Sequence, residues 1–402
     1  MKKGLIYLDH AATTPMDVAV HREMGQYCCL FFGNPATLYS LGRKANEAVE
    51  QARAAVARML SCSPDEVYFT SGGTESDNWA LQGIAFSRKD KGKHIVTSTI
   101  EYHAVLDTAD FLEKIGFEVT RVPVDSMALI DPDDVKKAIR KDTILISVMH
   151  ANNEVGTIEP VAEIGKIAKE AGIPFHTDAV QSVGKIPTDV DALGADLLSI
   201  SAHKFYGPKG VGAMYLRKGT RIQRFMHGGG QERNKRAGTH NVQGIVGLGA
   251  AAKLAFEHRD TDAERLRALA KKLRDGLVAT LPDIRVNGNS ERQLPGMVHI
   301  CVEGVEGEAM LLCLDGEDVC VSSGSACTTG SLDPSHVLLA MGMPAEIAHG
   351  SVRFTLGRHN TEEEIDRVLE VFPPIVEKLR RMSPTYKRTK PLPASLKHSH
   401  DT

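Results

Sequence analysis

Short hydrophobic runs and helical patterns alternate along the chain from about residue 65 to residue 217. The hydrophobic runs, rich in β-branched residues, predict strands at 67–71, 94–99, 118–124, 143–150, 174–178, 196–201 and 212–216. Helical spacing between them predicts helices at 133–140 and 161–171. The runs ILISVMH and LLSISAH are largely apolar rather than alternating, which is typical of parallel strands covered on both faces. The sequence therefore predicts an α/β domain with a mostly parallel sheet.

The C-terminal part of the chain has a different texture. A long helical pattern over 241–280 is followed by strand-like MVHICVE, DVCVSS and SVRFTL around a helical GEAMLLCL. Thr361 and Glu364 form a capping-box signature that opens a last helix, which Pro373 and Pro374 are expected to break or restart. These elements predict a smaller α+β domain.

The expected division places the domain boundary near residue 255. Residues 15–255 would form the large domain, and 256–382, together with 1–14, the small one. Residues 383–402 contain three prolines and little apolar periodicity, so an extended or flexible tail is expected there.

Composition and charge exclude several classes of protein. The 402 residues contain 48 Lys and Arg against 51 Asp and Glu, and a net charge of −3 lacks the signature of a nucleic-acid binder. No apolar run approaches the length of a membrane span, and the N-terminal apolar stretch is short for a signal peptide. We therefore expect a cytoplasmic protein without nucleic-acid or membrane partners.

Seven cysteines, an odd number without a CxxC pair or zinc-like spacing, argue against a disulfide framework and against an intrinsic metal site. Cys301 and Cys313 lie in apolar strings and are expected to be buried and inert. Cys327 lies in the string SSGSACTTGS, whose small polar residues are typical of an exposed, reactive thiol, although an ordinary loop cysteine fits equally well.

Two strand ends carry candidate catalytic groups. Lys204 follows an apolar strand and precedes a Gly/Pro-rich turn, where poor solvation would make its amine nucleophilic; a lysine that only reaches the surface is the alternative. Asp178 ends the run IPFHTD, where a carboxylate could hold a protonated pyridine nitrogen or simply cap a helix.

Two further features suggest anion binding. The loop TSGGTES lies between a predicted strand and a predicted helix and suits a phosphate, although it could be an ordinary connection. Arg353 lies among apolar neighbours and could grip a substrate carboxylate or form a structural ion pair.

Taken in order, these motifs closely resemble the cysteine desulfurases of the NifS/IscS class, which are pyridoxal phosphate (PLP) enzymes of the class V aminotransferase family. The resemblance runs from about residue 5 to 385. The matching strings are YLDHAATTP, FGNPATLY, FTSGGTES, EYHAV, HANNEVG, HTDAVQSVGKIP, SAHKFYGPKGVGAMYL, GGGQERNKRAGT, SSGSACTTGSLDPSHVL and SVRFTLGR. The resemblance implies the PLP-dependent transferase type I fold, with a large domain on a mostly parallel seven-stranded sheet, a smaller α+β domain, and a homodimer.

The resemblance also implies roles for individual residues. Lys204 matches the lysine that forms the Schiff base with PLP, and His103 the histidine stacked on its ring. Asp178 matches the partner of the pyridine nitrogen, and Gln181 the group bonded to the ring hydroxyl.

The remaining matched positions bind phosphate or substrate. Gly73, Thr74, Ser201 and His203 match phosphate-binding positions, and Thr239 a threonine that reaches the phosphate of the other subunit. Asn153 and Arg353 match residues near the substrate carboxylate.

The implied activity is conversion of L-cysteine to L-alanine, with sulfur left on Cys327 as a persulfide. Lys204 would act as general base, and His103 could shuttle a proton. The sulfur acceptor implied is an iron–sulfur scaffold protein, and Cys327 could help ligate a transient cluster. The string SSGSAC assigns the class with a longer, mobile cysteine loop, and the string HGSVRF and the segment 372–386 favour the nitrogen-fixation NifS type.

Three alternatives stay open at this point. A class V aminotransferase would need Lys204 and Asp178 but not Cys327, and a selenocysteine lyase would share the scaffold. A sulfur-carrier or scaffold protein without turnover is the alternative from another functional class.

Overall fold

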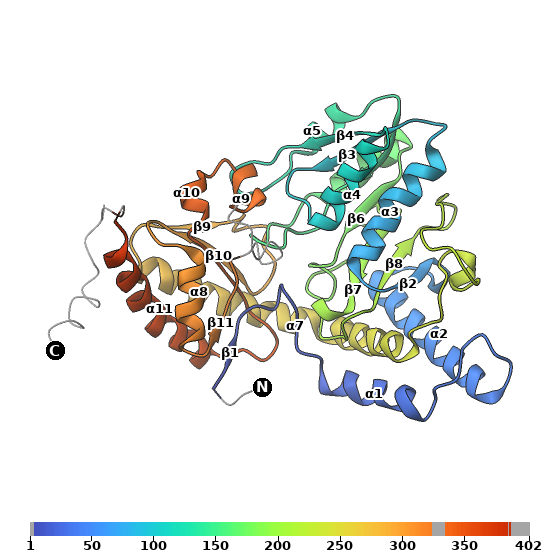
Figure 1. Ribbon diagram of the computed structural model, residues 1–402, viewed down its shortest axis with the longest axis horizontal. Coiled ribbons are helices and arrows are strands. Elements are labelled where there is room, and N and C mark those ends of the chain that lie inside the picture. The colour runs from blue at the N-terminus through green and yellow to red at the C-terminus, as the bar shows by residue number, and fades with distance from the viewer. Residues whose placement is uncertain (1–3, 324–333, 385, 387–402) are drawn as a thin grey trace.

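The computed structural model describes residues 4–323, 334–384 and 386 (Figure 1). The strands of its largest sheet are β2 (Val67–Thr70), β3 (His94–Ser98), β4 (Glu118–Val122), β5 (Thr143–Ser147), β6 (Phe175–Asp178), β7 (Leu197–Ser201) and β8 (Gly212–Leu216). All seven strands predicted from the hydrophobic runs are confirmed, most of them a residue or more shorter than expected.

The order of strands in this sheet is β2-β8-β7-β6-β5-β3-β4. Strand β8 pairs antiparallel with both β2 and β7, whereas the other neighbouring pairs are parallel. The prediction of a mostly parallel seven-stranded sheet is therefore confirmed. Because the parallel strands share one direction, the loops after them meet at one edge, where ligands bind in such sheets.

Helices cover both faces of the large sheet, which explains the continuously apolar strands. One face packs on α3 (Gly73–Arg88) and α4 (His103–Lys114). The other packs on α2 (Ser40–Leu60), α6 (Val161–Ala171), the first part of α7 (Val242–Thr280) and Val135 of α5 (Pro132–Ala138). In β5, Leu145 packs in the cluster that contains α3 and α4, and Ile146 in the cluster that contains α2 and α6, so this strand is covered on both faces.

A second, antiparallel sheet has the order β12-β10-β9. Its strands are β9 (Ile284–Asn287), β10 (Met297–Val302) and β12 (Ser351–Thr355). It packs on α8 (Gly307–Asp315), α11 (Glu362–Met382) and the second part of α7. Near it, β1 (Ile6–Tyr7) pairs with β11 (Val319–Cys320), and Ile6 and Leu8 join its hydrophobic cluster. Helices α1 (Val18–Cys29), α9 (His336–Ala340) and α10 (Ala345–Ala348) complete the α-helices of the described residues.

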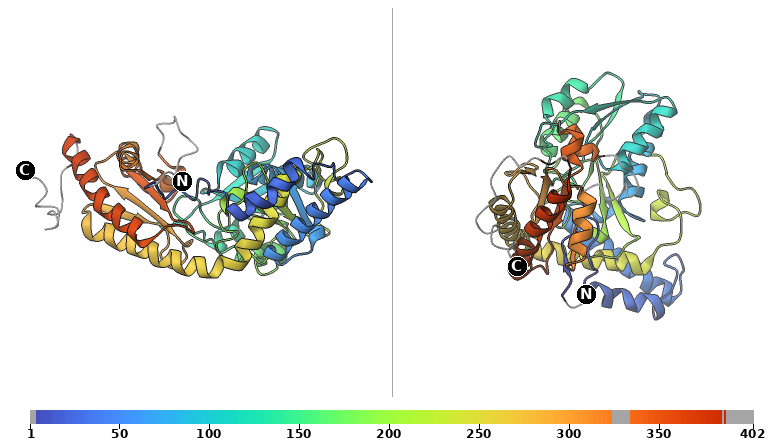
Figure 2. Two further views of the ribbon diagram at one scale, coloured as in Figure 1. Left: turned by 90° about the horizontal axis from the view of Figure 1, so that it is seen from below. Right: turned by 60° about the vertical axis from the view of Figure 1, so that its left-hand side comes forward.

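Helix α7 is 39 residues long and passes from one hydrophobic cluster to the other (Figure 2). Its residues Val242 to Ala255 pack against the large sheet, and Leu266 to Leu277 against the small sheet. The proposed domain boundary near residue 255 falls inside this helix, and the division into 15–255 and 256–382 stays a prediction.

The expected break at Pro373 and Pro374 is wrong, because α11 continues through both prolines to Met382. Proline removes one backbone donor and crowds the preceding turn, which ordinarily bends or ends a helix. Here Phe372 and Val376, on either side of the prolines, are buried in the same hydrophobic cluster, and this packing offsets the lost hydrogen bonds. The predicted capping box is confirmed, since Thr361 and Glu364 bond each other's backbone N–H groups.

Among the described residues, no helix is both long enough and apolar enough to cross a bilayer. Most of the expected tail, 383–402, lies outside the described residues. Tyr386 is described, and its hydroxyl donates to a carboxylate oxygen of Asp283 at 2.7 Å.

Candidate active site

A cavity of about 300 Å³ opens at the carboxyl edge of the large sheet. Its size is at the lower end of the range of small-ligand pockets. Most of the residues predicted for the site border it: Gly73, Thr74, Asn153, Asp178, Gln181, Ser201, His203, Lys204 and Arg353. Most of these residues meet because they follow strands of the large sheet that end at one edge, whereas Arg353 comes from β12 of the small sheet.

Lys204 lies at the end of a short 3-10 turn (Ala202–Lys204) that follows β7 directly. Its Nζ donates to the carbonyl oxygens of Ala11 and Ala12 at 2.6 and 2.9 Å. These two residues belong to the segment between β1 and α1, so the N-terminal part of the chain closes one side of the cavity. The lysine is therefore held inside the site and does not merely reach the surface.

Two carboxylates lie beside each other on the cavity wall. Asp178, at the end of β6, accepts a hydrogen bond from the Val180 N–H at 2.8 Å. Asp77, in α3, is fully buried, and its Oδ1 has no hydrogen-bond partner among the described residues. Burial raises the pKa of both groups, and the charge of Asp178 adds to the shift at Asp77. The Val180 N–H and the charge of Lys204 both favour the charged form of Asp178, whereas a hydrogen bond from Ser199 alone favours that of Asp77. The negative charge of the pair is therefore assigned to Asp178, and Asp77 is the neutral member.

The start of α3 supplies the anion-binding part of the cavity. Gly72 precedes the helix with φ 157°, a conformation open mainly to glycine. A Cβ on Gly73 would come within 2.6 Å of Val180 Cγ2, so the chain there has room only for glycine. The start of this helix, Thr74, Ser201 and His203 all border the cavity, and their N–H and hydroxyl groups suit an anion. Burial and the nearby lysines lower the pKa of His203 to about 4, so its ring is neutral at pH 7.

Arg353 lies in the middle of β12 with a side chain that is 3% exposed. Its guanidinium donates to Asp9 Oδ1 at 2.9 Å and to the carbonyl oxygen of Asn153 at 2.7 Å. The structural ion pair considered from the sequence is thus present, and the same side chain also borders the cavity.

Two of the predicted residues do not border this cavity in the described part of the chain. His103 begins α4 next to the lining residue Tyr102, and its ring lies 5.1 Å from that of His336. Thr239 is exposed in the segment 231–240, which Arg236 joins to Glu75 of α3 through an ion pair of 2.8 Å.

Cys327 lies outside the described residues. The chain before it is fixed beside Arg353, because the backbone of Ser322 pairs with that of Arg353 and Ser351 donates to the carbonyl oxygen of Ser323. The chain after it is fixed beside Asn153, since Ser335 donates to Glu154 at 2.5 Å. Both flanks of the cysteine segment are thus anchored next to residues of the cavity or their direct neighbours.

The other cysteines differ in burial. Cys301 is buried as expected, and burial raises the pKa of its thiol to about 11. The expectation that Cys313 is buried is wrong: it is half-buried, because α8 turns the adjacent Leu312 outward to solvent. No group of three or more His, Cys, Asp or Glu side chains in the described residues is placed to hold a metal ion.

Sequence reasoning missed several residues of the site, notably Asp77, Tyr102, Ala11 and Ala12. Asp77 could have been found, because it follows Gly73 by four residues and therefore shares its helix face. The contact of Ala11 and Ala12 with Lys204 joins segments nearly two hundred residues apart and has no local signal.

The donor set of the cavity fits pyridoxal phosphate. The helix start, hydroxyls and His203 suit a phosphate group, and buried Asp178 suits a protonated pyridine nitrogen. The amine of Lys204 borders the same space, as attachment of the aldehyde requires.

Comparisons with known proteins agree with this fit. The Aminotransferase class-V family profile matches residues 6–368. "Cysteine desulfurase IscS" of Dictyoglomus turgidum is 55% identical over 95% of this chain and 97% of its own length.

Solved structures lead to the same family. One described as a NifS-like protein is 40% identical, with a TM-score of 0.88 over 93% of this chain and 100% of its own. SspA in complex with cysteine is 37% identical, with a TM-score of 0.78 over 89% of this chain and 100% of its own. This chain belongs to the class-V aminotransferase family and, within it, to the PLP-dependent cysteine desulfurases.

Proposed function

We propose that this chain converts L-cysteine to L-alanine and delivers the sulfur atom to Cys327 as a persulfide. The observation that carries the proposal is one cavity bordered by the amine of Lys204, the buried carboxylate of Asp178 and the guanidinium of Arg353. An amine, an anion for a ring nitrogen and a cation for a substrate carboxylate are what amino-acid chemistry with PLP requires.

The coenzyme would be held by the residues already gathered around the cavity. Gly73, Thr74, Ser201 and His203 would bind its phosphate, and Gln181 would donate to its ring oxygen. Thr239 would reach the phosphate of a partner subunit. When bound, PLP supplies an electron sink that stabilises negative charge at the substrate Cα.

Arg353 and Asn153 would orient the cysteine substrate. The guanidinium of Arg353 is already fixed by Asp9 and by the Asn153 carbonyl, so little freedom is lost when it binds a carboxylate. Lys204 would remove the proton from Cα, and its position against two carbonyl oxygens keeps its Nζ inside the cavity.

Cys327 would then attack the substrate Sγ as a thiolate. The Sγ–Sγ bond forms as the Cβ–Sγ bond breaks, the electron pair stays with the carbon skeleton, and protons complete alanine. One thiol and one cysteine give one persulfide and one alanine, so no external oxidant is needed. His103 would carry a proton near the substrate, beside the anchored chain that follows Cys327.

The proposed assembly is a homodimer. Large apolar side chains are exposed on and after α1, namely Val18, Leu30, Phe32, Leu38 and Tyr39. Burial of these side chains against a second copy would be favourable. It would also give exposed Thr239 a second subunit whose phosphate site it could reach.

The proposed sulfur acceptor is an iron–sulfur scaffold protein, with Cys327 as a transient cluster ligand and the cytoplasm as the compartment. The nitrogen-fixation type stays a prediction, because the relatives carry both the IscS and the NifS-like names. The division into domains of 15–255 and 256–382, the latter with 1–14, is part of the same proposal.

Replacement of Cys327 by alanine tests the activity. After incubation with L-cysteine, the unchanged protein should gain one sulfur atom by mass spectrometry and release alanine without a keto-acid acceptor. Cys327→Ala should keep the yellow PLP band but lose the added sulfur, whereas Cys28→Ala, at an exposed thiol, should behave like the unchanged protein. Persulfide formation in Cys327→Ala would overturn the assignment.

A further inference from the structure

A chain of hydrogen bonds runs behind the cavity from Lys185 to Lys204. Lys185 Nζ donates to Gln181 Oε1 at 3.1 Å, and Gln181 Nε2 donates to the Ala11 carbonyl oxygen at 3.0 Å. The same carbonyl oxygen accepts from Lys204 Nζ. Lys185 thus contacts a lining residue of the cavity but is not itself one of them.

The chemistry of these groups sets the direction of the Gln181 amide. A backbone carbonyl can only accept a hydrogen bond, so Ala11 requires the amide nitrogen, and the Lys185 amine has N–H donors in either protonation state. The amide must therefore turn its nitrogen to Ala11 and its oxygen to Lys185. One of the two N–H bonds of that nitrogen is used by Ala11, which leaves the other for a ligand in the cavity.

Lys185 is an unusual residue for this place. Burial, together with the nearby charges of Lys204 and Arg353, lowers the pKa of its ammonium to about 7. A methionine would fill similar space without desolvating an amine, so packing alone does not require a lysine here.

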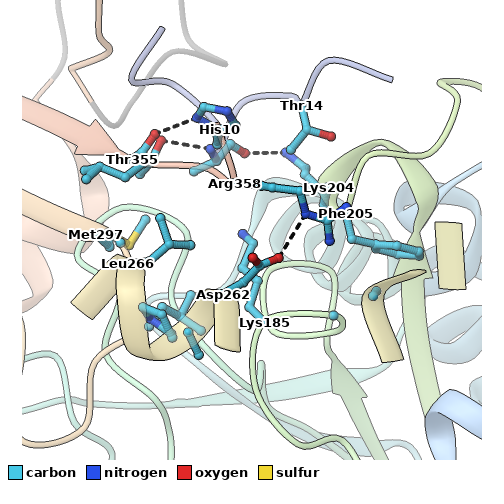
Figure 3. A pocket seen from close by; sticks show the side chains of 18 of the residues that line it. His10, Thr14, Lys185, Lys204, Phe205, Asp262, Leu266, Met297, Thr355 and Arg358 are labelled. Carbon is cyan, nitrogen blue, oxygen red and sulfur yellow. Dashed lines mark hydrogen bonds and ion pairs between the residues drawn. The ribbon is translucent and has the colours of Figure 1, made fainter. Parts of the chain in front are cut away.

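Lys185 itself borders a second, smaller pocket (Figure 3). Its volume of about 40 Å³ can admit about three water molecules, and Lys185, Lys204 and the ion pair of Arg358 with Asp262 border it. Lys185 therefore borders this pocket and at the same time donates to Gln181, a lining residue of the larger cavity.

We propose that Lys185 is a positioning residue that clamps the Gln181 amide, so that its free N–H points to an acceptor oxygen on the ring of the bound coenzyme. This inference rests on the proposed role of Gln181 in holding PLP. Lys185 acts through Gln181 and touches neither coenzyme nor substrate.

A double-mutant cycle on the PLP-loaded protein tests the proposal. The variants are Lys185→Met, Gln181→Ala and the double variant, with Lys209→Met, at an exposed lysine of the neighbouring turn, as the matched control. The readouts are the wavelength of the visible PLP band and the rate at which PLP is lost on dilution into a coenzyme trap.

Lys185→Met and Gln181→Ala should shift the band in the same direction and release PLP roughly threefold faster or more. The double variant should release PLP at the rate of Gln181→Ala, because the clamp has nothing to hold once the amide is removed. Lys185→Arg, which keeps a donor, should restore the band, and this variant also serves if Lys185→Met does not fold.

Two results would overturn the inference. One is a Lys185→Met protein with the band and release rate of the unchanged protein. The other is an equal effect of Lys185→Met with and without Gln181, which would mean that Lys185 acts by a route that does not pass through the amide. If Gln181→Ala changes neither readout, the proposed contact of Gln181 with PLP is refuted, and the inference about Lys185 is refuted with it. If both readouts change as expected but the protein does not react with cysteine, only the proposed activity is refuted.

Discussion

Replacing Glu232 by glutamine is expected to destabilise the protein near the segment that carries Thr239. The buried carboxylate accepts two hydrogen bonds from Arg53, both at 2.8 Å. It also accepts from the Phe69 backbone N–H at 2.8 Å and contacts His240 at 2.6 Å. These contacts join the segment 231–240 to α2 and β2.

The size of the effect follows from the charge of this group. Burial opposes ionisation of Glu232, but the hydrogen bonds from Arg53 and His240 outweigh it and lower the pKa from 4.5 to about 2. That shift corresponds to about 3 kcal/mol of stability. Removing one partner of a buried ion pair costs about 3–5 kcal/mol, a range that includes this value.

The sign of the pH dependence is also fixed. Since the folded-state pKa lies below the unfolded one, the contribution of Glu232 is complete above pH 4.5 and is lost as the pH falls toward 2. Urea unfolding of the PLP-loaded protein should therefore show Glu232→Gln about 3 kcal/mol less stable at pH 7. The difference from the unchanged protein should shrink by about 1 kcal/mol at pH 4.

Glu257→Gln is the matched control, since Glu257 is exposed on α7 and should show no loss at either pH. A Glu232→Gln protein as stable as the control, or a loss that stays the same from pH 7 to pH 4, would refute the reasoning.

Three further predictions concern the cavity. Arg353→Lys should raise KM for L-cysteine roughly tenfold with an unchanged PLP band, because a lysine cannot keep the forked contacts of the guanidinium; an unchanged KM would contradict the carboxylate role. Asp178→Asn should weaken PLP binding roughly tenfold or more in a spectroscopic titration. Asp77→Asn, at a carboxyl group that is already neutral, should bind PLP nearly as the unchanged protein does. Equal losses in the two variants would show that the ionised carboxylate is misassigned. Gly73→Ala should lose PLP faster on dialysis, because the new methyl group would lie 2.6 Å from a neighbouring side chain, while Gly25→Ala, with open space around it, should not; equal retention would mean that the loop yields freely.

The strands of the large sheet could be predicted from the sequence, but neither their order nor the antiparallel direction of β8 could. Strands covered on both faces leave long apolar runs, and the helices between them have their own spacing, so both periods were visible. The prolines of α11 could not be judged in this way. Whether Pro373 is tolerated depends on packing by Phe372 and Val376 against strands far away in the sequence.

The site residues that could be predicted are those at or directly after a strand end, such as Asp178 and Lys204. The site was less predictable where the contacts are tertiary. The ion pair of Arg353 with Asp9 and the seating of Lys204 against Ala11 depend on an N-terminal segment that crosses between the two sheets. Nothing in the local sequence specifies such a crossing.

Helix α7 has a consequence for how the protein loses its structure. At 1.5 Å per residue its 39 residues extend about 58 Å, and one continuous ladder of backbone hydrogen bonds serves both hydrophobic clusters. Opening that starts among Leu266 to Leu277 can therefore spread along the same ladder toward Ala255 with no loop between the two clusters to stop it. Amide exchange along α7 should accordingly follow one cooperative opening, so that the cluster around the small sheet and the one beneath the coenzyme site protect each other from local unfolding.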